Sequence, residues 1–213
     1  MFVPSPYRPP DSTWMADLIR ANPLAMLVTN GATDGPFATH LPVIPATDAA
    51  EWPTDLTGTV LLGHMNRANP HWKALTAETP ALLTFTGPHA YVSPTVYEYS
   101  PAAPTWNFTS VHLRGRLRTL AAGEETLEVV RATVSAFEAD HGTGWDMSES
   151  IGYFRKLLPA VGAFRFTVTK AEGMFKLSQE QKPDVRERVR ASFEQTPCTR
   201  HRETATLMRR LPS

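Results

Sequence analysis

The stretch GHMNRANPHW (63–72) places polar side chains capable of chemistry directly after the apolar run TVLLG (59–63), which suits a buried strand. A neutral imidazole such as that of His64 can coordinate iron or hydrogen-bond to a flavin. A guanidinium such as that of Arg67 can hold a phosphate or a propionate. The spacing therefore leaves two interpretations open. The stretch is either a polar turn with a helix start, or a corner that binds an anionic, planar cofactor.

Further residues of this kind occur at the ends, or along one face, of the other predicted strands. They are His40, His89, Tyr91, Ser93, Tyr97, Trp106, Asn107, His112 and Arg114. Strands that close into a barrel bring such residues to a shared rim. Each also has a plainer interpretation, as a hydrogen-bonded structural histidine, a packed aromatic ring or a solvated charge. No phosphate-binding loop, dinucleotide fingerprint or nucleophile elbow is present in the sequence.

The hydrophobic periodicity predicts an α+β domain built around a small antiparallel barrel. The expected strands cover residues 24–30, 36–44, 59–64, 81–85, 105–120 and 162–173. Helices are expected from residue 11 or 12 to about 22, from Pro70 to about 75, and over 124–141 and 148–158. Two more are expected after Pro183, interrupted at Thr196-Pro197. We expect residues 1–181 to form the cofactor-binding barrel domain and residues 182–213 a basic helical tail packed on it.

Composition narrows the classes of function. The net charge is zero, so we do not expect a nucleic-acid partner, although residues 182–213 carry eight Lys or Arg against four Asp or Glu. The single cysteine, Cys198, excludes an intramolecular disulfide framework and a cysteine-based zinc site within one chain. The N-terminus does not resemble a signal peptide and no apolar run could span a bilayer, so we expect a cytoplasmic protein with no membrane partner.

Four motifs in order resemble the PaiB-type family of FMN-binding negative transcriptional regulators. They are GHMNRANPHW (63–72), FTGPHAYVSPTVY (85–97), PTWNFTSVHLRG (104–115) and FKLSQEQ (175–181). The resemblance implies a split β-barrel of the FMN-binding and pyridoxamine-phosphate-oxidase kind. It also implies a homodimer, with the cofactor bound at the barrel interface.

Within this family the chain most resembles the haem-dependent piperazate synthases. TVY (95–97) stands where regulators tend to have a tryptophan-containing SPSWY, and SQEQ (178–181) replaces the commoner SQNR. The resemblance implies haem b as cofactor and the closure of N5-hydroxy-L-ornithine to L-piperazic acid plus water, through an intramolecular N–N bond. The alternative is an FMN-binding regulator whose basic tail contacts DNA.

The preferred resemblance also implies roles for particular residues. His64 would be the axial iron ligand through Nε2, with a neighbour orienting its other ring nitrogen, and Arg67 and Arg114 would neutralise the propionates. Asn66, Trp106 and Ser178 would complete the cofactor site. Proton carriers would come from three residues that the sequence does not rank: Lys176, Tyr91 and His89. In the FMN alternative, Arg67, Lys176 or Ser178 would hold the flavin phosphate.

Overall fold

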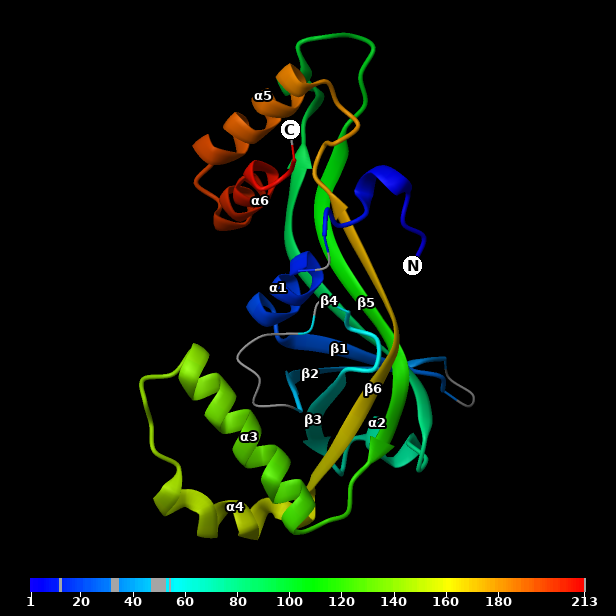
Figure 1. The fold of residues 1–213 in the computed structure, drawn as a ribbon, viewed down its shortest axis with the longest axis vertical. Helices are drawn as coiled ribbons and strands as arrows, with labels where there is room; N and C mark the ends of the chain where they lie inside the picture. The colour runs from blue at the N-terminus through cyan, green and yellow to red at the C-terminus, as the bar shows by residue number, and fades with distance from the viewer. Residues whose placement is uncertain (12, 32–34, 47–52, 54, 213) are drawn as a thin grey trace. The chain divides into compact units, whose positions relative to one another are not determined.

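The six strands form a closed antiparallel barrel in the order β1-β2-β3-β6-β5-β4 (Figure 1). The structure is a computed structural model, and it describes every residue except 12, 32–34, 47–52, 54 and 213. The strands are β1 (Leu24–Thr29), β2 (Phe37–Pro45), β3 (Val60–Asn66), β4 (Thr79–Val92), β5 (Thr105–Thr119) and β6 (Val161–Lys176). The sequence-based prediction of a split β-barrel is confirmed. The turn predicted at 31–35 and the loop predicted at 45–57 fall partly outside the described residues.

The helices that flank the barrel in the described part of the chain are α1 (Thr13–Ala21), α2 (Pro70–Ala74), α3 (Glu124–Asp140), α4 (Ile151–Leu157), α5 (Pro183–Gln195) and α6 (Thr199–Arg209). Short 3-10 turns occur at η1 (Ser5–Tyr7), η2 (Pro94–Tyr97), η3 (Ser148–Ser150) and η4 (Leu158–Ala160). No helix among these residues is long and apolar enough to cross a membrane.

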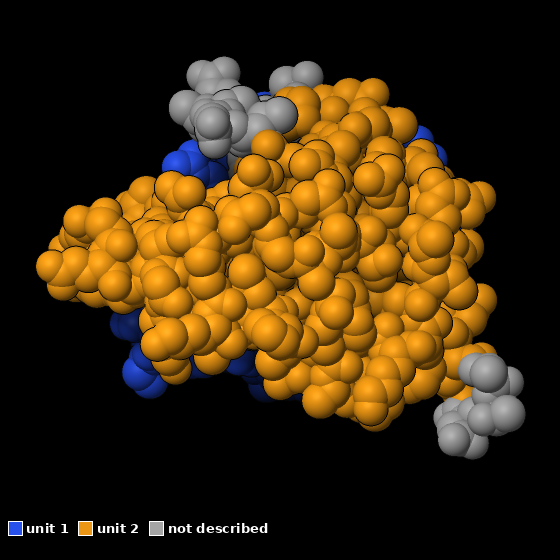
Figure 2. Space-filling model, turned by 90° about the horizontal axis from the view of Figure 1, so that it is seen from below, with its two compact units in different colours: residues 1–22, 85–112, 172–213 blue, residues 23–84, 113–171 orange. Residues whose placement is uncertain are grey.

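The chain divides into two compact units, coloured separately in Figure 2. Unit 1 comprises residues 1–22, 85–112 and 172–213, and unit 2 comprises residues 23–84 and 113–171. Each of the three long strands β4, β5 and β6 contributes residues to both units. The domain boundary predicted at residue 182 remains a prediction.

Alternation along β5 follows the predicted pattern. Val111, Leu113 and Leu117 are fully buried, whereas Arg114 and Arg116 are exposed. Successive side chains of a strand point to opposite faces, so this strand lines the apolar interior of the barrel with one face only. Strand β4 is longer than the predicted 81–85, because the glycine and proline that follow do not break it.

In unit 2 a second apolar cluster lies on the outer face of the barrel, under α3. It contains Ile44, Leu62, Leu120, Val129 and Ala163, with Phe137 packed against it. The apolar spacing of the sequence predicts that Leu127, Val130, Val134 and Phe137 form the buried face of this helix. Of these, Leu127 is buried as predicted, together with Val129 and Thr133, whereas Val130, Val134 and Phe137 are only half-buried.

In unit 1 the C-terminal tail forms two helices, α5 and α6, which are separated at Thr196-Pro197 as predicted. Arg188 of α5 donates hydrogen bonds from Nη2 to the carbonyl of Tyr97 (2.8 Å) and from Nε to that of Val96 (3.2 Å). These bonds attach the tail to η2, which is the TVY segment noted in the sequence.

Candidate cofactor site

A hollow of about 530 Å³ opens on unit 2 beside strands β2 and β3 and the turn η4. Its volume lies within the usual range of small-molecule sites. Leu41, Pro42, Met65, Leu157, Ala160 and Val161 supply apolar wall, and Thr39, His40, His64, Asn66 and Asn69 supply the polar groups. A largely apolar wall with a few converging polar groups is typical of a cofactor or ligand site.

The period of the strands explains why two histidines reach this hollow. Ile44 of β2 and Leu62 of β3 are register partners, and both are buried in the outer cluster under α3. Residues two apart on a strand share a face, so His64 lies on the same outer face as Leu62, and His40 on the same face as Ile44. Gly63, between Leu62 and His64 on β3, is turned toward the barrel interior, where a side chain would meet the ring of Phe164.

One ring nitrogen of His64 is buried and has no hydrogen-bond partner among the described residues. Its Nδ1 hydrogen-bonds to no described residue, and burial lowers the pKa of its imidazole from the usual 6.5. The ring is therefore neutral at pH 7, the form that coordinates a metal. The expectation that a neighbour orients the ring through its other nitrogen is not met among the described residues. Buried polar groups are usually hydrogen-bonded, so this nitrogen is available to a ligand or to a water molecule.

His71, the second histidine of the stretch, is structural. Its side chain is 1% exposed, its Nε2 lies 2.9 Å from Thr29 Oγ1, and its Nδ1 lies 2.8 Å from Thr39 Oγ1. The ring also stacks on Phe37, with centroids 5.3 Å apart. Both nitrogens are thus satisfied. Because Thr39 lines the hollow, His71 fixes part of its wall rather than binding a ligand.

Asn69, Pro70 and Trp72 form the turn into α2 and pack it against the barrel, as the polar-turn interpretation of this stretch implies. Asn69 caps α2 by accepting a hydrogen bond from the backbone N–H of His71 at 2.9 Å. A Cβ on Gly162 would lie 2.4 Å from the Trp72 ring, so only glycine allows this close approach. The turn therefore packs its indole directly against the start of β6.

Arg67 and Asn66 differ in how closely they fit their predicted roles. Asn66 lines the hollow, and its Oδ1 accepts the backbone N–H of Ala68 at 2.7 Å. The guanidinium of Arg67 lies over the Trp72 ring, 5.5 Å from its centroid, and its buried Nε has no partner among the described residues. Arg67 is not among the residues that line the hollow, so its role as an anion clamp remains a prediction. Arg114 is exposed on β5, where its carbonyl accepts a hydrogen bond from Thr169 Oγ1.

His89, Tyr91 and Trp106 belong to unit 1, where they form a cluster of their own. The Trp106 ring lies 5.7 Å from that of His89 and 5.9 Å from that of Tyr91, and Trp106 and Tyr91 are 52% and 45% exposed. The ring nitrogen Nε2 of His89 lies 3.0 Å from Nη1 of Arg200 on α6. The structure thus brings these three predicted residues together in unit 1.

Lys176 and Ser178 are engaged within unit 1. Lys176 Nζ donates to Thr105 Oγ1 and lies over the Tyr7 ring. Ser178 is fully buried, and its hydroxyl lies 2.9 Å from Nδ2 and 3.2 Å from Oδ1 of Asn107. A cofactor could bind this hydroxyl only by displacing that contact. Their predicted roles at a cofactor remain predictions.

The sequence identified His40 as a candidate residue, but it did not identify Thr39 or Asn69 as residues of a site, and all three line the hollow. The alternation of β2, extended outward from Ile44, places His40 on the same face. Thr39 and Asn69 carried no comparable signal, because their place depends on α2 folding back over β2.

Comparisons with known proteins identify the family. Residues 1–170 match the family described as "Putative FMN-binding domain". Protease synthase and sporulation protein PAI 2 of Bacillus subtilis (strain 168) is 27% identical over 184 residues, covering 85% of this chain and 83% of that protein. An uncharacterized protein of Emericella nidulans is 29% identical over 217 residues, covering 84% and 85%.

Among solved structures, the FAD and Heme binding protein from Mycobacterium smegmatis superposes with a TM-score of 0.55 at 18% identity. The match covers 84% of this chain and 77% of that one, and at this identity it shows the fold alone. The family match extends over well more than half of the 213 residues, and it includes the first three of the four ordered motifs and agrees with the barrel. The chain is a split-barrel member of the PaiB-type family of FMN-binding-domain proteins.

Proposed function

We propose that this chain binds haem b through His64 and acts as a piperazate synthase, closing N5-hydroxy-L-ornithine to L-piperazic acid and water. The observation that carries the cofactor assignment is the neutral His64 imidazole, with its unpartnered buried Nδ1, in a hollow with a largely apolar wall. The choice of substrate rests on the resemblance of TVY (95–97) and SQEQ (178–181) to the piperazate synthase branch.

The residues of the hollow fit a haem. His64 would bind the iron, and Leu41, Pro42, Leu157 and Val161 would contact apolar surface of the cofactor. Because Nδ1 is the nitrogen without a partner, it joins Nε2 as a candidate ligand atom. Arg67 and Arg114 stay the proposed partners of the propionates. When bound, the iron would supply a Lewis acid that polarises the N–O bond of the substrate.

The reaction balances without an external oxidant or reductant. The α-nitrogen forms a bond to N5, the N5–O bond breaks, and the hydroxyl oxygen leaves as water. The α-ammonium must first lose a proton, and an apolar wall favours its neutral amine form because burial disfavours charge. Holding both nitrogens of one flexible chain within reach of each other lowers the entropic part of the barrier.

The proton acceptor is proposed from two sets of residues. His40 lines the same hollow as His64, so its side chain can directly contact a ligand bound at His64. Lys176, Tyr91 and His89, which belong to unit 1, keep the roles that the family resemblance implies. We also propose a homodimer. Leu24, Tyr153 and Leu157 of unit 2 are 62%, 61% and 42% exposed, and exposed large apolar side chains are typical of an interface.

The second candidate is an FMN-binding regulator of the PaiB type. The family description and the relative from Bacillus subtilis favour it. In that case Arg67 or Lys176 would hold the flavin phosphate in place of a propionate. Ser178 is a weaker candidate for this contact, because Asn107 already occupies its hydroxyl.

Reconstitution distinguishes the two candidates. The purified chain is mixed with haemin or with FMN, desalted, and its visible spectrum is recorded. The loaded protein is then incubated with N5-hydroxy-L-ornithine, and the product is examined by mass spectrometry for the loss of one water. We expect a Soret band and the dehydrated cyclic product. A stable flavin complex with no Soret band would favour the regulator and contradict the synthase.

A further inference from the structure

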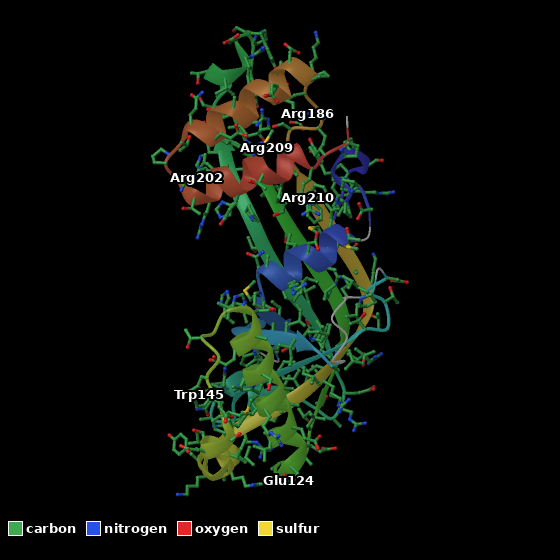
Figure 3. The ribbon with its side chains drawn as sticks, turned by 60° about the vertical axis from the view of Figure 1, so that its left-hand side comes forward. Glu124, Trp145, Arg186, Arg202, Arg209 and Arg210 are labelled. Atoms are coloured by element: carbon green, nitrogen blue, oxygen red, sulfur yellow. The ribbon has the colours of Figure 1, made fainter. Side chains whose placement is uncertain are left out.

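The helices α5 and α6 of unit 1 enclose a groove of about 350 Å³. Its lining consists of Pro183, Arg186, Glu187, Arg190, Met208 and Arg209. Figure 3 shows Arg186 of α5 and Arg209 of α6 toward the same end of the helix pair, with Arg202 toward the other end. The guanidinium groups of Arg186, Arg190 and Arg209 therefore line one concave surface. The tail that carries them, residues 182–213, has a net charge of about +4.

Two of the three guanidiniums are held in place by acidic residues. Glu194 accepts hydrogen bonds from both: its Oε1 lies 2.6 Å from Arg209 Nη2 and also contacts Arg190 Nη1. Arg190 is fixed further by Glu187. One carboxylate thus joins the two helices and draws Arg190 and Arg209 together. Because a guanidinium has several N–H donors, Arg209 retains donors for a ligand.

Arg186 is the third cation, and it is not neutralised. Among the described residues its side chain makes no hydrogen bond and no ion pair, although it is only partly exposed and lines the groove. A guanidinium beside two that are already positioned resembles the way proteins present forked N–H donors to phosphate oxygens. The groove thus combines fixed donors with an uncompensated charge.

We propose that this groove binds the phosphate group of a small phosphorylated molecule. Its volume is that of a small-molecule site. Glu187, which lines the groove, and Glu194, which bonds to Arg190 and Arg209, would repel an extended polyanion, and a chain of zero net charge lacks the basic footprint of a nucleic-acid binder. All the groups concerned belong to α5 and α6, so the site is independent of the hollow at His64. A ligand that contacts Arg186 and Arg209 together would also hold α5 to α6 and stabilise the folded tail.

Calorimetric titration of the full-length chain tests the site. Inorganic phosphate and glycerol 3-phosphate are titrated separately at constant ionic strength, with sodium chloride as the reference anion. We expect saturable binding of a phosphate species but not of chloride. Tighter binding of glycerol 3-phosphate assigns the site to a phosphate ester, whereas tighter binding of inorganic phosphate assigns it to the free ion.

Variants locate the binding. Arg186→Gln removes a cation whose side chain makes no hydrogen bond or ion pair with the described residues, so the variant should fold normally and bind phosphate about tenfold more weakly or worse. Arg202→Gln removes an exposed arginine from α6 outside the groove, and it should bind within about twofold of the unmodified chain. A normal thermal unfolding midpoint for both variants shows that the comparison is between folded proteins.

Two results would overturn the proposal. One is the absence of saturable phosphate binding to the unmodified chain, and the other is equal weakening by Arg186→Gln and Arg202→Gln. Duplex DNA serves as a further probe. If DNA binds and neither phosphate compound does, and both variants weaken the DNA complex alike, the tail is a diffuse polyanion surface rather than a phosphate site.

Discussion

Replacing Gly63 by alanine tests how tightly the strand that carries His64 packs against the barrel core. A Cβ at position 63 would lie 2.5 Å from Cζ of Phe164 and 3.1 Å from both of its Cε atoms. Phe164 is the register partner of Gly63 on β6 and is fully buried, so its ring has little room to move away. The added methyl group must therefore displace β3 or the ring.

The expected cost follows from two opposing effects. Overpacking a well-packed core costs roughly 1–3 kcal/mol. Replacing glycine by alanine within a strand recovers about 0.5–1 kcal/mol of backbone conformational entropy. We therefore expect Gly63→Ala to lower the free energy of unfolding by about 1 kcal/mol, which is the difference between the midpoints of those ranges. Because His64 is the next residue, cofactor affinity should also fall.

Urea denaturation of four chains measures this: the unmodified protein, Gly63→Ala, Phe164→Leu and the double variant. Leucine lacks the ring atoms that the new methyl group would meet, so Gly63→Ala should cost at least about 1 kcal/mol less in that background. Gly152→Ala on α4 is the matched control. Nothing lies within 4 Å of a Cβ there, and alanine favours helix, so it should stabilise by up to about 1 kcal/mol. If the effects of Gly63→Ala and Phe164→Leu on the free energy of unfolding add within about 0.5 kcal/mol in the double variant, position 63 is not packed against the Phe164 ring as argued.

Two further predictions concern buried polar groups. Burial lowers the pKa of His71 and of His64, so the unfolded chain gains a proton first as the pH falls. The free energy of unfolding should therefore decrease below about pH 6.5, by at most about 1.4 kcal/mol per pH unit for each ring. His71→Gln should flatten this dependence in denaturation curves recorded from pH 7.5 to 5.5, and an unchanged slope would contradict the assignment. Ser178→Ala leaves the buried Asn107 amide short of a partner and should cost about 1–3 kcal/mol without cofactor. An unchanged urea midpoint together with weaker FMN binding would instead indicate that Ser178 contacts the cofactor.

The barrel was predictable because its strands alternate and its turns carry clear breakers. β5 shows this best, with Val111, Leu113 and Leu117 facing in and arginines facing out. The true length of β4 was not predictable, because Gly87 and Pro88 normally interrupt a strand. Here Gly87 leaves the space that Thr109 and Leu18 occupy, and the carbonyl of Pro88 accepts a hydrogen bond from Thr109. Both are contacts between distant parts of the sequence.

The candidate site was predictable only in part. His64 and Asn66 could be found because they directly follow the apolar run of residues 59–63, and the structure places both at the end of β3, on the hollow. The structural role of His71 could not be predicted, because its two hydrogen bonds reach Thr29 and Thr39, which are distant in the sequence. Ser178 belongs to the fourth family motif, but its hydrogen bond to Asn107 of β5 could not be predicted from that motif. Spacing along the chain carries no information about such partners.

The central claim is that His64 holds the cofactor in the hollow. The visible spectrum of haem-reconstituted protein tests it most directly when the unmodified chain is compared with His64→Ala and with His141→Ala, whose exposed histidine lies outside the hollow. We expect a Soret band of coordinated haem in the unmodified chain and in His141→Ala, and its loss or displacement in His64→Ala alone. An identical Soret band in all three proteins would contradict the assignment of His64 as the ligand.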